Sequence, residues 1–280
     1  MNTAICAIIS KTRLHQALAM HESIMNYNSS YWFYLFCVDD EAYELLSRMT
    51  LNRTTVINYS NINDERLIEA KKERELSQYC WTLKPYAILH IFNEFDNIHR
   101  VVYVDTDIYF YRDPETIFEN APEWSVLYTT HKVNDLANGG FVCFKRDRTG
   151  LSALEWWKEQ CTKWCSAYYD EHGNLGDQGY INSFKQMYSK IHCSELPGVN
   201  VAPWNQHLLK FEYRDGKIYV DGTGLIFFHF SCLRMFNKWD YWIGFNVTPI
   251  NYIYEPYIDV LRKKIDVIET LSPGFSKNFF

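Results

Sequence analysis

Short apolar runs alternate with helical patterns along the first half of the chain. Residues 4–9 form a continuous apolar run, which is typical of a strand buried on both faces of a sheet. The next segment, 12–27, has apolar residues at helical spacing. Further strands are expected at 31–38, 54–59 and 101–104, and further helices at 41–49 and 83–95. This alternation predicts an α/β fold with a doubly wound, mostly parallel sheet and helices on both faces.

A charged segment and a proline-containing helix are expected between residues 63 and 95. Residues 63–78 are highly charged with a weak apolar stripe, which favours an exposed helix, with a mobile flap as the alternative. The helix expected at 83–95 opens with the letters TLKPY. This start places Pro85 in the first turn, where proline is tolerated because its missing N–H has no helical partner.

The pattern loosens after about residue 130. Asn138, Gly139 and Gly140 are expected to form a turn that runs into a strand at 141–144. An amphipathic helix is expected at 150–165, a helix near 180–187, strands at 191–196 and 225–230, and a C-terminal helix at 257–271. Because no repeat or flexible linker interrupts the chain, we expect one domain over residues 1–280.

The strand at 101–104 ends in the sequence Asp105-Thr106-Asp107. Two carboxylates at the end of a buried strand would repel each other, and burial would add to that cost. A divalent cation such as Mn²⁺ or Mg²⁺ would remove both problems, since hard cations take oxygen ligands. Parallel sheets also bind ligands at the carboxyl ends of their strands. The alternative is a polar turn with two solvated carboxylates.

Composition and charge exclude some classes of protein. The net charge of −6 argues against a general nucleic-acid binder, which would carry a basic face. No run approaches the roughly 20 apolar residues of a membrane span. The N-terminal segment is expected to be a strand rather than a signal peptide, and the eight cysteines are scattered. A cytoplasmic protein is therefore expected.

Five motifs in a fixed order resemble a known family. They are LKP at 83–85, DTD at 105–107, NGGF at 138–141, GDQ at 176–178 and HFS at 229–231, followed by a Lys-Trp pair. This order resembles the nucleotide-sugar glycosyltransferases of the GT-A fold, and most of all the bacterial branch related to glycosyltransferase family 8. The resemblance implies a Rossmann-like, mixed and mostly parallel sheet. It also implies a nucleotide-binding half (about 1–130), an acceptor half (about 131–245) and a C-terminal helical segment (about 246–280).

The resemblance implies a metal and phosphate site. Asp105 and Asp107 match the metal-binding pair that holds Mn²⁺ or Mg²⁺ against the donor diphosphate, with Thr106 between them, and His229 matches a third ligand. Lys238 resembles the family's phosphate-binding lysine. The segment HFSCLRMFNKW departs from the family signature, because it lacks the Gly and the Pro and has one extra residue. Arg234 is therefore an alternative to Lys238.

The resemblance also implies donor contacts. The sugar would meet Asn138 and Gly139, with Gln178 beneath the anomeric carbon and Asp177 on the sugar hydroxyls. An N-cap role for Asp177 is compatible with this. The nucleoside would lie against Ile9 and Ser10, with Asp39 or Asp40 near the base or ribose. Lys84 would lie near the donor, or else be a solvated helix lysine.

The predicted reaction moves a sugar from a nucleotide sugar, with UDP as the expected nucleotide, to a glycan or glycolipid acceptor shaped by Trp204 and Asn205. Gln178 in place of a carboxylate favours retention of anomeric configuration. An inverting enzyme with Asp177, Asp135 or Asp170 as base is one alternative, and a non-catalytic sugar-binding module is another. The resemblance suggests assembly of a bacterial surface polysaccharide or lipopolysaccharide. Basic residues 262–264 suggest peripheral contact with the inner face of the membrane.

Overall fold

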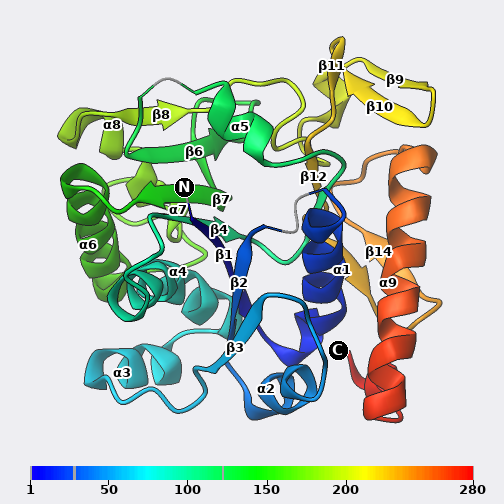
Figure 1. The fold of residues 1–280 in the computed structure, drawn as a ribbon, viewed down its shortest axis with the longest axis horizontal. Coiled ribbons are helices and arrows are strands. Elements are labelled where there is room, and N and C mark those ends of the chain that lie inside the picture. The colour runs from blue at the N-terminus through cyan, green and yellow to red at the C-terminus, as the bar shows by residue number, and fades with distance from the viewer. Residues whose placement is uncertain (1, 28–29, 122, 280) are drawn as a thin grey trace.

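A seven-stranded sheet forms the centre of the protein (Figure 1). The computed structural model describes residues 2–27, 30–121 and 123–279. In spatial order the strands are β3 (Thr54–Asn58), β2 (Trp32–Cys37), β1 (Thr3–Ile9), β4 (Arg100–Val104), β7 (Ala137–Lys145), β6 (Val126–Thr130) and β8 (Ile191–Cys193). Strand β7 runs antiparallel to both of its neighbours, and all other pairings are parallel. The predicted mixed, mostly parallel sheet is confirmed.

Helices cover both faces of this sheet, as predicted (Figure 1). One face carries α1 (Leu14–Met25), α2 (Asp40–Ser47) and α9 (Asn251–Leu271). The other face carries α3 (Glu65–Glu73), α4 (Leu76–Glu94) and α6 (Arg148–Lys163). Successive residues of β1 alternate between the two cores: Ile5 packs with the first set of helices and Cys6 with the second. The unbroken apolar run at the start of the chain therefore reflects burial on both sides.

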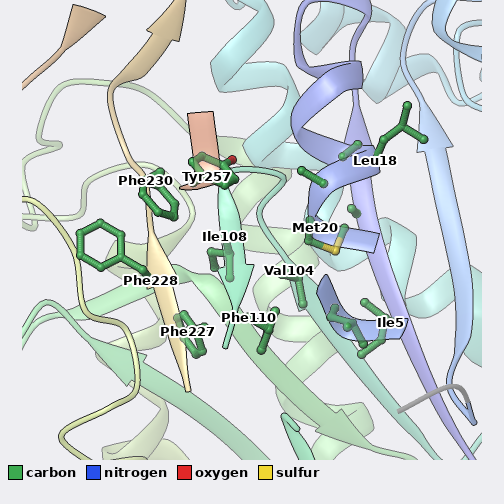
Figure 2. Close-up of a cluster of buried hydrophobic side chains, with 14 of the residues drawn as sticks. Ile5, Leu18, Met20, Val104, Ile108, Phe110, Phe227, Phe228, Phe230 and Tyr257 are labelled. Carbon is green, nitrogen blue, oxygen red and sulfur yellow. The ribbon is translucent and has the colours of Figure 1, made fainter. Parts of the chain in front are cut away.

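A short antiparallel pair joins the C-terminal half to the centre of the sheet. Strand β5 (Ile108–Phe110) pairs with β12 (Phe227–His229), in a register that sets His229 opposite Ile108. Aromatic packing fixes this pair: the ring of Phe230 stacks on Tyr257 of α9 with centroids 3.8 Å apart (Figure 2). Burying such a side chain contributes about 1.5–3 kcal/mol. The packing thereby holds His229 beside the end of β4.

The remaining elements are short and lie around the sheet. They are α5 (Glu115–Glu119), α7 (Gln178–Ile181), α8 (Phe184–Met187), the three-stranded sheet of β9 (Phe211–Arg214), β10 (Lys217–Val220) and β11 (Thr223–Gly224), and the hairpin of β13 (Leu233–Met235) and β14 (Tyr241–Ile243). Single turns of 3-10 helix occur at Lys11–Arg13, Gln206–Leu208 and Phe275–Asn278. Within the described ranges, no helix is both long and apolar enough to cross a bilayer.

The start of α4 differs from the prediction. The helix begins at Leu76, so Pro85 lies inside it and not in its first turn. A capping box sets this earlier start: Glu75 and Gln78 each accept a hydrogen bond from the backbone of the other. The charged segment before it forms α3, in which Leu67 and Ala70 are buried against the core. The other seven residues of α3 are exposed, so the predicted exposed helix is confirmed, with Leu67 and Ala70 as its buried stripe.

The prediction of a turn at residues 138–140 was also wrong. Asn138, Gly139 and Gly140 lie within β7, where the amide of Asp105 donates a 2.8 Å hydrogen bond to the carbonyl of Gly140. The ladder between β6 and β7 shifts register at Tyr128 and Thr129, opposite this stretch. The C-terminal helix was predicted too short, because α9 begins at Asn251 with Pro256 inside it.

Candidate active site

A cavity of about 670 Å³ opens where β4 ends. It brings together most of the residues that the motifs single out. Asp105, Asp107, Lys84, Asn138, Gly139, Asp177, Gln178 and His229 all line it. These residues come from the end of β4, from α4, from β7, from the start of α7 and from β12. The end of a parallel strand is the position where such sheets bind ligands.

Asp105, Asp107 and His229 form a group that could hold a metal ion. One ligand atom from each lies within 4.8 Å of the other two. The Nε2 atom of His229 is 3.1 Å from Oδ1 of Asp107 and 4.0 Å from Oδ2 of Asp105. Two carboxylate oxygens and one imidazole nitrogen are ligands that suit Mn²⁺, while Mg²⁺ prefers oxygen alone. The donor set therefore fits a divalent cation.

The protonation of this group reflects the contact between Asp107 and His229. Burial alone would raise the pKa of Asp107, but the facing imidazole outweighs it and lowers that pKa to about 2. Burial would lower the pKa of His229, and the carboxylates of Asp107 and Asp105 reverse this and raise it. In the absence of a cation, each of the two side chains therefore favours the charged form of the other across the 3.1 Å contact.

Neighbouring side chains orient Asp105. The hydroxyl of Tyr103 donates to its Oδ1 at 2.9 Å, and the Lys84 ammonium lies 3.3 Å from the same oxygen. The second oxygen, Oδ2, is therefore the one that faces His229. Tyr103 precedes Asp105 by two residues, so both side chains leave the strand on the same face. This arrangement prepares one oxygen of Asp105 for a cation.

Lys84 is a buried cation rather than a solvated one. Its side chain is 3% exposed and forms ion pairs with Asp105 and, at 3.2 Å, with Asp177. It also donates to the carbonyl of Gly139 at 3.0 Å. Burial opposes its charge, but the two carboxylates prevail and raise its pKa. The interpretation of Lys84 as a solvated helix lysine was wrong.

Asp177 is the buried partner of Lys84. Burial raises its pKa to about 6, Lys84 limits the rise and the nearby charge of Asp105 adds to it. Asp177 is at the N-cap position of α7, but its side chain makes no capping hydrogen bond. Its carboxylate therefore belongs to the network around Lys84 and not to the helix end.

Glycine is needed at two positions of β7 because the site approaches the backbone closely. A Cβ atom at residue 139 would lie 2.4 Å from Oδ2 of Asp177, and one at residue 140 would lie 2.6 Å from Cε1 of His229. Real Cβ atoms do not approach other atoms this closely. The two glycines thus let a strand form one wall of the cavity.

A polar layer supports His229 from behind. Its Nδ1 atom faces Oδ1 of the fully buried Asn200 at 3.4 Å, and the ring of Trp204 packs edge-on against the imidazole. Asn205 is also fully buried and donates to the carbonyl of Asn200 at 2.9 Å. Trp204 lines the cavity, whereas Asn205 supports its wall from inside. An acceptor at Nδ1 favours the tautomer that leaves Nε2 as a metal ligand.

Gln178 and Asn138 are held by the backbone of β7. The side-chain oxygen of Gln178 accepts from the amide of Gly139 at 3.3 Å, and that of Asn138 accepts from the amide of Gly140 at 3.1 Å. The Asn138 side-chain nitrogen also lies 3.2 Å from Nε2 of His131. Both amides thus sit at fixed positions on the cavity wall.

Six of the residues predicted for the donor site are not among those that line the cavity. Ile9 is in the core, Ser10 bonds to Thr12, and Thr106 is buried. Asp39 caps α2 by accepting from the amide of Ala42, and it also accepts from the amide of Lys11. Lys238 pairs with Asp266 of α9 at 2.5 Å, whereas Arg234 does line the cavity. Asp40 bonds to Ser60 outside this cavity.

Three residues of the site were not predicted from the sequence. Tyr103 and Asn200 orient the metal group, and Arg13 lines the cavity just beyond the end of β1. Tyr103 could have been found from its spacing of two residues before Asp105. Arg13 could have been found from its place after a neighbouring parallel strand, since the carboxyl ends of such strands meet at one edge. No local pattern marks Asn200.

Comparisons with known proteins agree with this geometry. Residues 4–146, about half of the chain, match the family described as glycosyl transferase family 8. The uncharacterized proteins YfnF and YfnD of Bacillus subtilis (strain 168) are 32% and 31% identical to this chain. These alignments cover 99% and 97% of this chain, and 97% and 93% of the relatives.

Solved glycosyltransferase structures share the fold. Apo GlyE from Streptococcus pneumoniae TIGR4 has a TM-score of 0.60 at 16% identity, covering 100% of this chain and 64% of GlyE. This chain thus spans just under two thirds of the length of that structure. The galactosyltransferase LgtC has a TM-score of 0.54 at 13% identity, covering 93% of this chain and 95% of LgtC. The chain belongs to glycosyl transferase family 8 and is a glycosyltransferase with the GT-A fold.

Proposed function

We propose that this nucleotide-sugar glycosyltransferase transfers a sugar from a UDP-linked donor with the help of a divalent cation, Mn²⁺ or Mg²⁺. The observation that carries the proposal is the convergence of Asp105, Asp107 and His229 within 4.8 Å at the end of a central strand. A bound cation would neutralise the negative charge that develops on the leaving diphosphate. Titration of UDP with and without Mn²⁺, and a screen of nucleotide sugars for donor hydrolysis, test the proposal. UDP binding that is unaffected by the metal would contradict it.

A retaining reaction is the better-supported stereochemical outcome. An inverting enzyme needs a carboxylate base beside the acceptor. Among the described residues that line the cavity, the carboxylates are Asp105, Asp107 and Asp177, and the first two belong to the metal group. Asp177 is paired with Lys84, while Asp135 and Asp170 are not cavity-lining. Gln178 also lines the cavity, and its neutral amide would meet the sugar instead.

Gln178→Ala should lower turnover about 100-fold and change donor binding far less, because the amide would act on the sugar as charge develops there. Steady-state kinetics and a UDP titration on the same preparation measure the two effects. Gln186→Ala on the exposed side of α8 is a matched control and should behave like the wild type. A normal rate for Gln178→Ala would make the residue structural.

Metal binding should become tighter as pH rises. His229 must lose its proton to ligate, and its pKa is raised by Asp107 and Asp105 in the metal-free protein. Below that raised pKa each bound cation displaces one proton, so affinity for Mn²⁺ should rise about tenfold per pH unit and then level off. Calorimetry in buffers of different ionisation enthalpy counts the released protons. An affinity independent of pH across the histidine range would remove His229 from the ligand set.

The acceptor is proposed to be a glycan or glycolipid of a bacterial surface polysaccharide, bound at the aromatic side of the cavity beside Trp204. Contact with a membrane at the cytoplasmic face has less support. Of the three basic residues in 262–264, Arg262 pairs with Asp259 and Lys264 with Glu22. Paired cations attract an anionic surface weakly. Exposed aromatic side chains such as Trp239, which is 68% exposed, would have to contribute.

A further inference from the structure

We propose that Arg13 binds the diphosphate of the donor, in the role that the family resemblance gave to Lys238; this inference rests on the proposed function. Lys238 pairs with Asp266 on α9 and is not among the residues that line the cavity. Arg13 lines the same cavity as Asp107 and His229. Arg13 lies outside the motifs that resemble the family.

The topology of the sheet places Arg13 next to the metal group. Strands β1 and β4 are parallel neighbours, with Cys6 paired to Tyr103. Their carboxyl ends therefore meet at one edge of the sheet. Arg13 follows β1 by one turn of 3-10 helix, and Asp105 follows β4 directly. A phosphate on a cation held by Asp105 and Asp107 would thus lie on the side from which Arg13 enters the cavity.

A neutral side chain orients the guanidinium of Arg13. Its Nη1 atom donates to Oε1 of Gln16 at 2.8 Å, and Gln16 is only 1% exposed. Across the described ranges, no carboxylate lies within ion-pair distance of Arg13. Arg13 and the three residues of the metal group open onto the same cavity. Arg13 is thus positioned, close to the metal group and not neutralised.

The charges of the cavity call for such a cation. A divalent cation would be balanced by Asp105 and Asp107, and Lys84 is balanced by Asp177. These groups together leave no net positive charge for a diphosphate, which carries at least two negative charges. The planar guanidinium of Arg13 can donate two parallel hydrogen bonds to a phosphate. Arg234 also lines the cavity, but its guanidinium lies over the ring of Trp242 at 6.0 Å.

Titrations of UDP and of uridine, both in saturating Mn²⁺, test the inference. Arg13→Ala should weaken UDP binding about 10- to 100-fold, as expected for a lost hydrogen-bonded charge, and leave uridine binding unchanged. Arg13→Lys should restore part of the loss. Arg13→Ala should bind Mn²⁺ without nucleotide as tightly as the wild type, or slightly more tightly. Such binding would show that the cavity of the variant has folded.

Two control variants make the result specific. Lys11→Ala removes a cation from the same turn, one that is paired with Glu41, and Lys238→Ala removes the residue named by the resemblance. Both should bind UDP within about twofold of the wild type. If Lys238→Ala weakened UDP binding, or if Arg13→Ala weakened the binding of UDP and of uridine equally, the inference would be overturned. A wild-type protein that binds no UDP with Mn²⁺ would instead reject the proposed function, and this inference with it.

Discussion

Asp107→Ala should abolish metal-dependent UDP binding and lower sugar transfer by about 10³-fold, because it removes a ligand from the proposed cation site. The variant also leaves the buried His229 without the carboxylate it contacts at 3.1 Å. The imidazole should then titrate at lower pH, since burial disfavours its charged form. Calorimetric titration of UDP with Mn²⁺ and a donor-hydrolysis assay measure the loss.

Asp135→Ala serves as the control for this experiment. Asp135 is an exposed carboxylate on the loop before β7 and does not line the cavity. Its removal should leave both UDP binding and turnover near wild type, and would also test its alternative role as an inverting base. Unchanged turnover in Asp107→Ala would count against a catalytic metal at this position.

Lys84→Met should destabilise the protein by about 3–5 kcal/mol, because it removes the cation between two carboxylates and leaves Asp177 buried without its partner. The double variant Lys84→Met/Asp177→Asn should recover much of this loss, since it also removes the unpaired charge. Urea unfolding of the two single variants, the double variant and the wild type gives the coupling energy.

An exposed lysine is the matched control for this experiment. Lys163→Met on α6 breaks a pair with Glu159 in which both side chains are well exposed, and should cost less than about 1 kcal/mol. If Lys84→Met cost no more than Lys163→Met, then the pairing of Lys84 would not hold the site together.

The order of strands and helices could be predicted from the sequence, because buried faces place apolar residues at regular spacing. Strand β1 is buried on both faces, so residues 3–9 show an almost unbroken apolar run. Helix starts were less accessible, because a cap depends on a few hydrogen bonds and not on periodicity. The capping box at Glu75 and Gln78 moved the start of α4 back by seven residues from its expected position.

Residues of the candidate site could be predicted from the sequence only where they belong to a recognisable motif. Asp105 and Asp107 stand at a strand end that the sequence marks clearly. The burial of Lys84 was not accessible, because its partner Asp177 is far along the chain and meets it only through folding. The glycines at 139 and 140 suggested a turn, whereas close contacts with Asp177 and His229 require them within a strand.

The division of residues 1–280 into three segments, with boundaries near residues 130 and 245, stays a prediction. The structure joins these segments closely: β12 pairs with β5, and α9 packs against α1 (Figure 1). The pairing of β12 with β5 brings His229 to the end of β4. The metal group therefore contains residues from both the predicted nucleotide-binding half and the predicted acceptor half. Local sequence patterns do not reveal such long-range contacts.

Anomalous diffraction from crystals grown with Mn²⁺ and UDP would show whether a cation joins the three side chains to the diphosphate. One strong manganese peak is expected within ligand distance of Asp105, Asp107 and His229, with the diphosphate oxygens completing its coordination. A diphosphate bound in this cavity without manganese at these three side chains would contradict the proposed cation site.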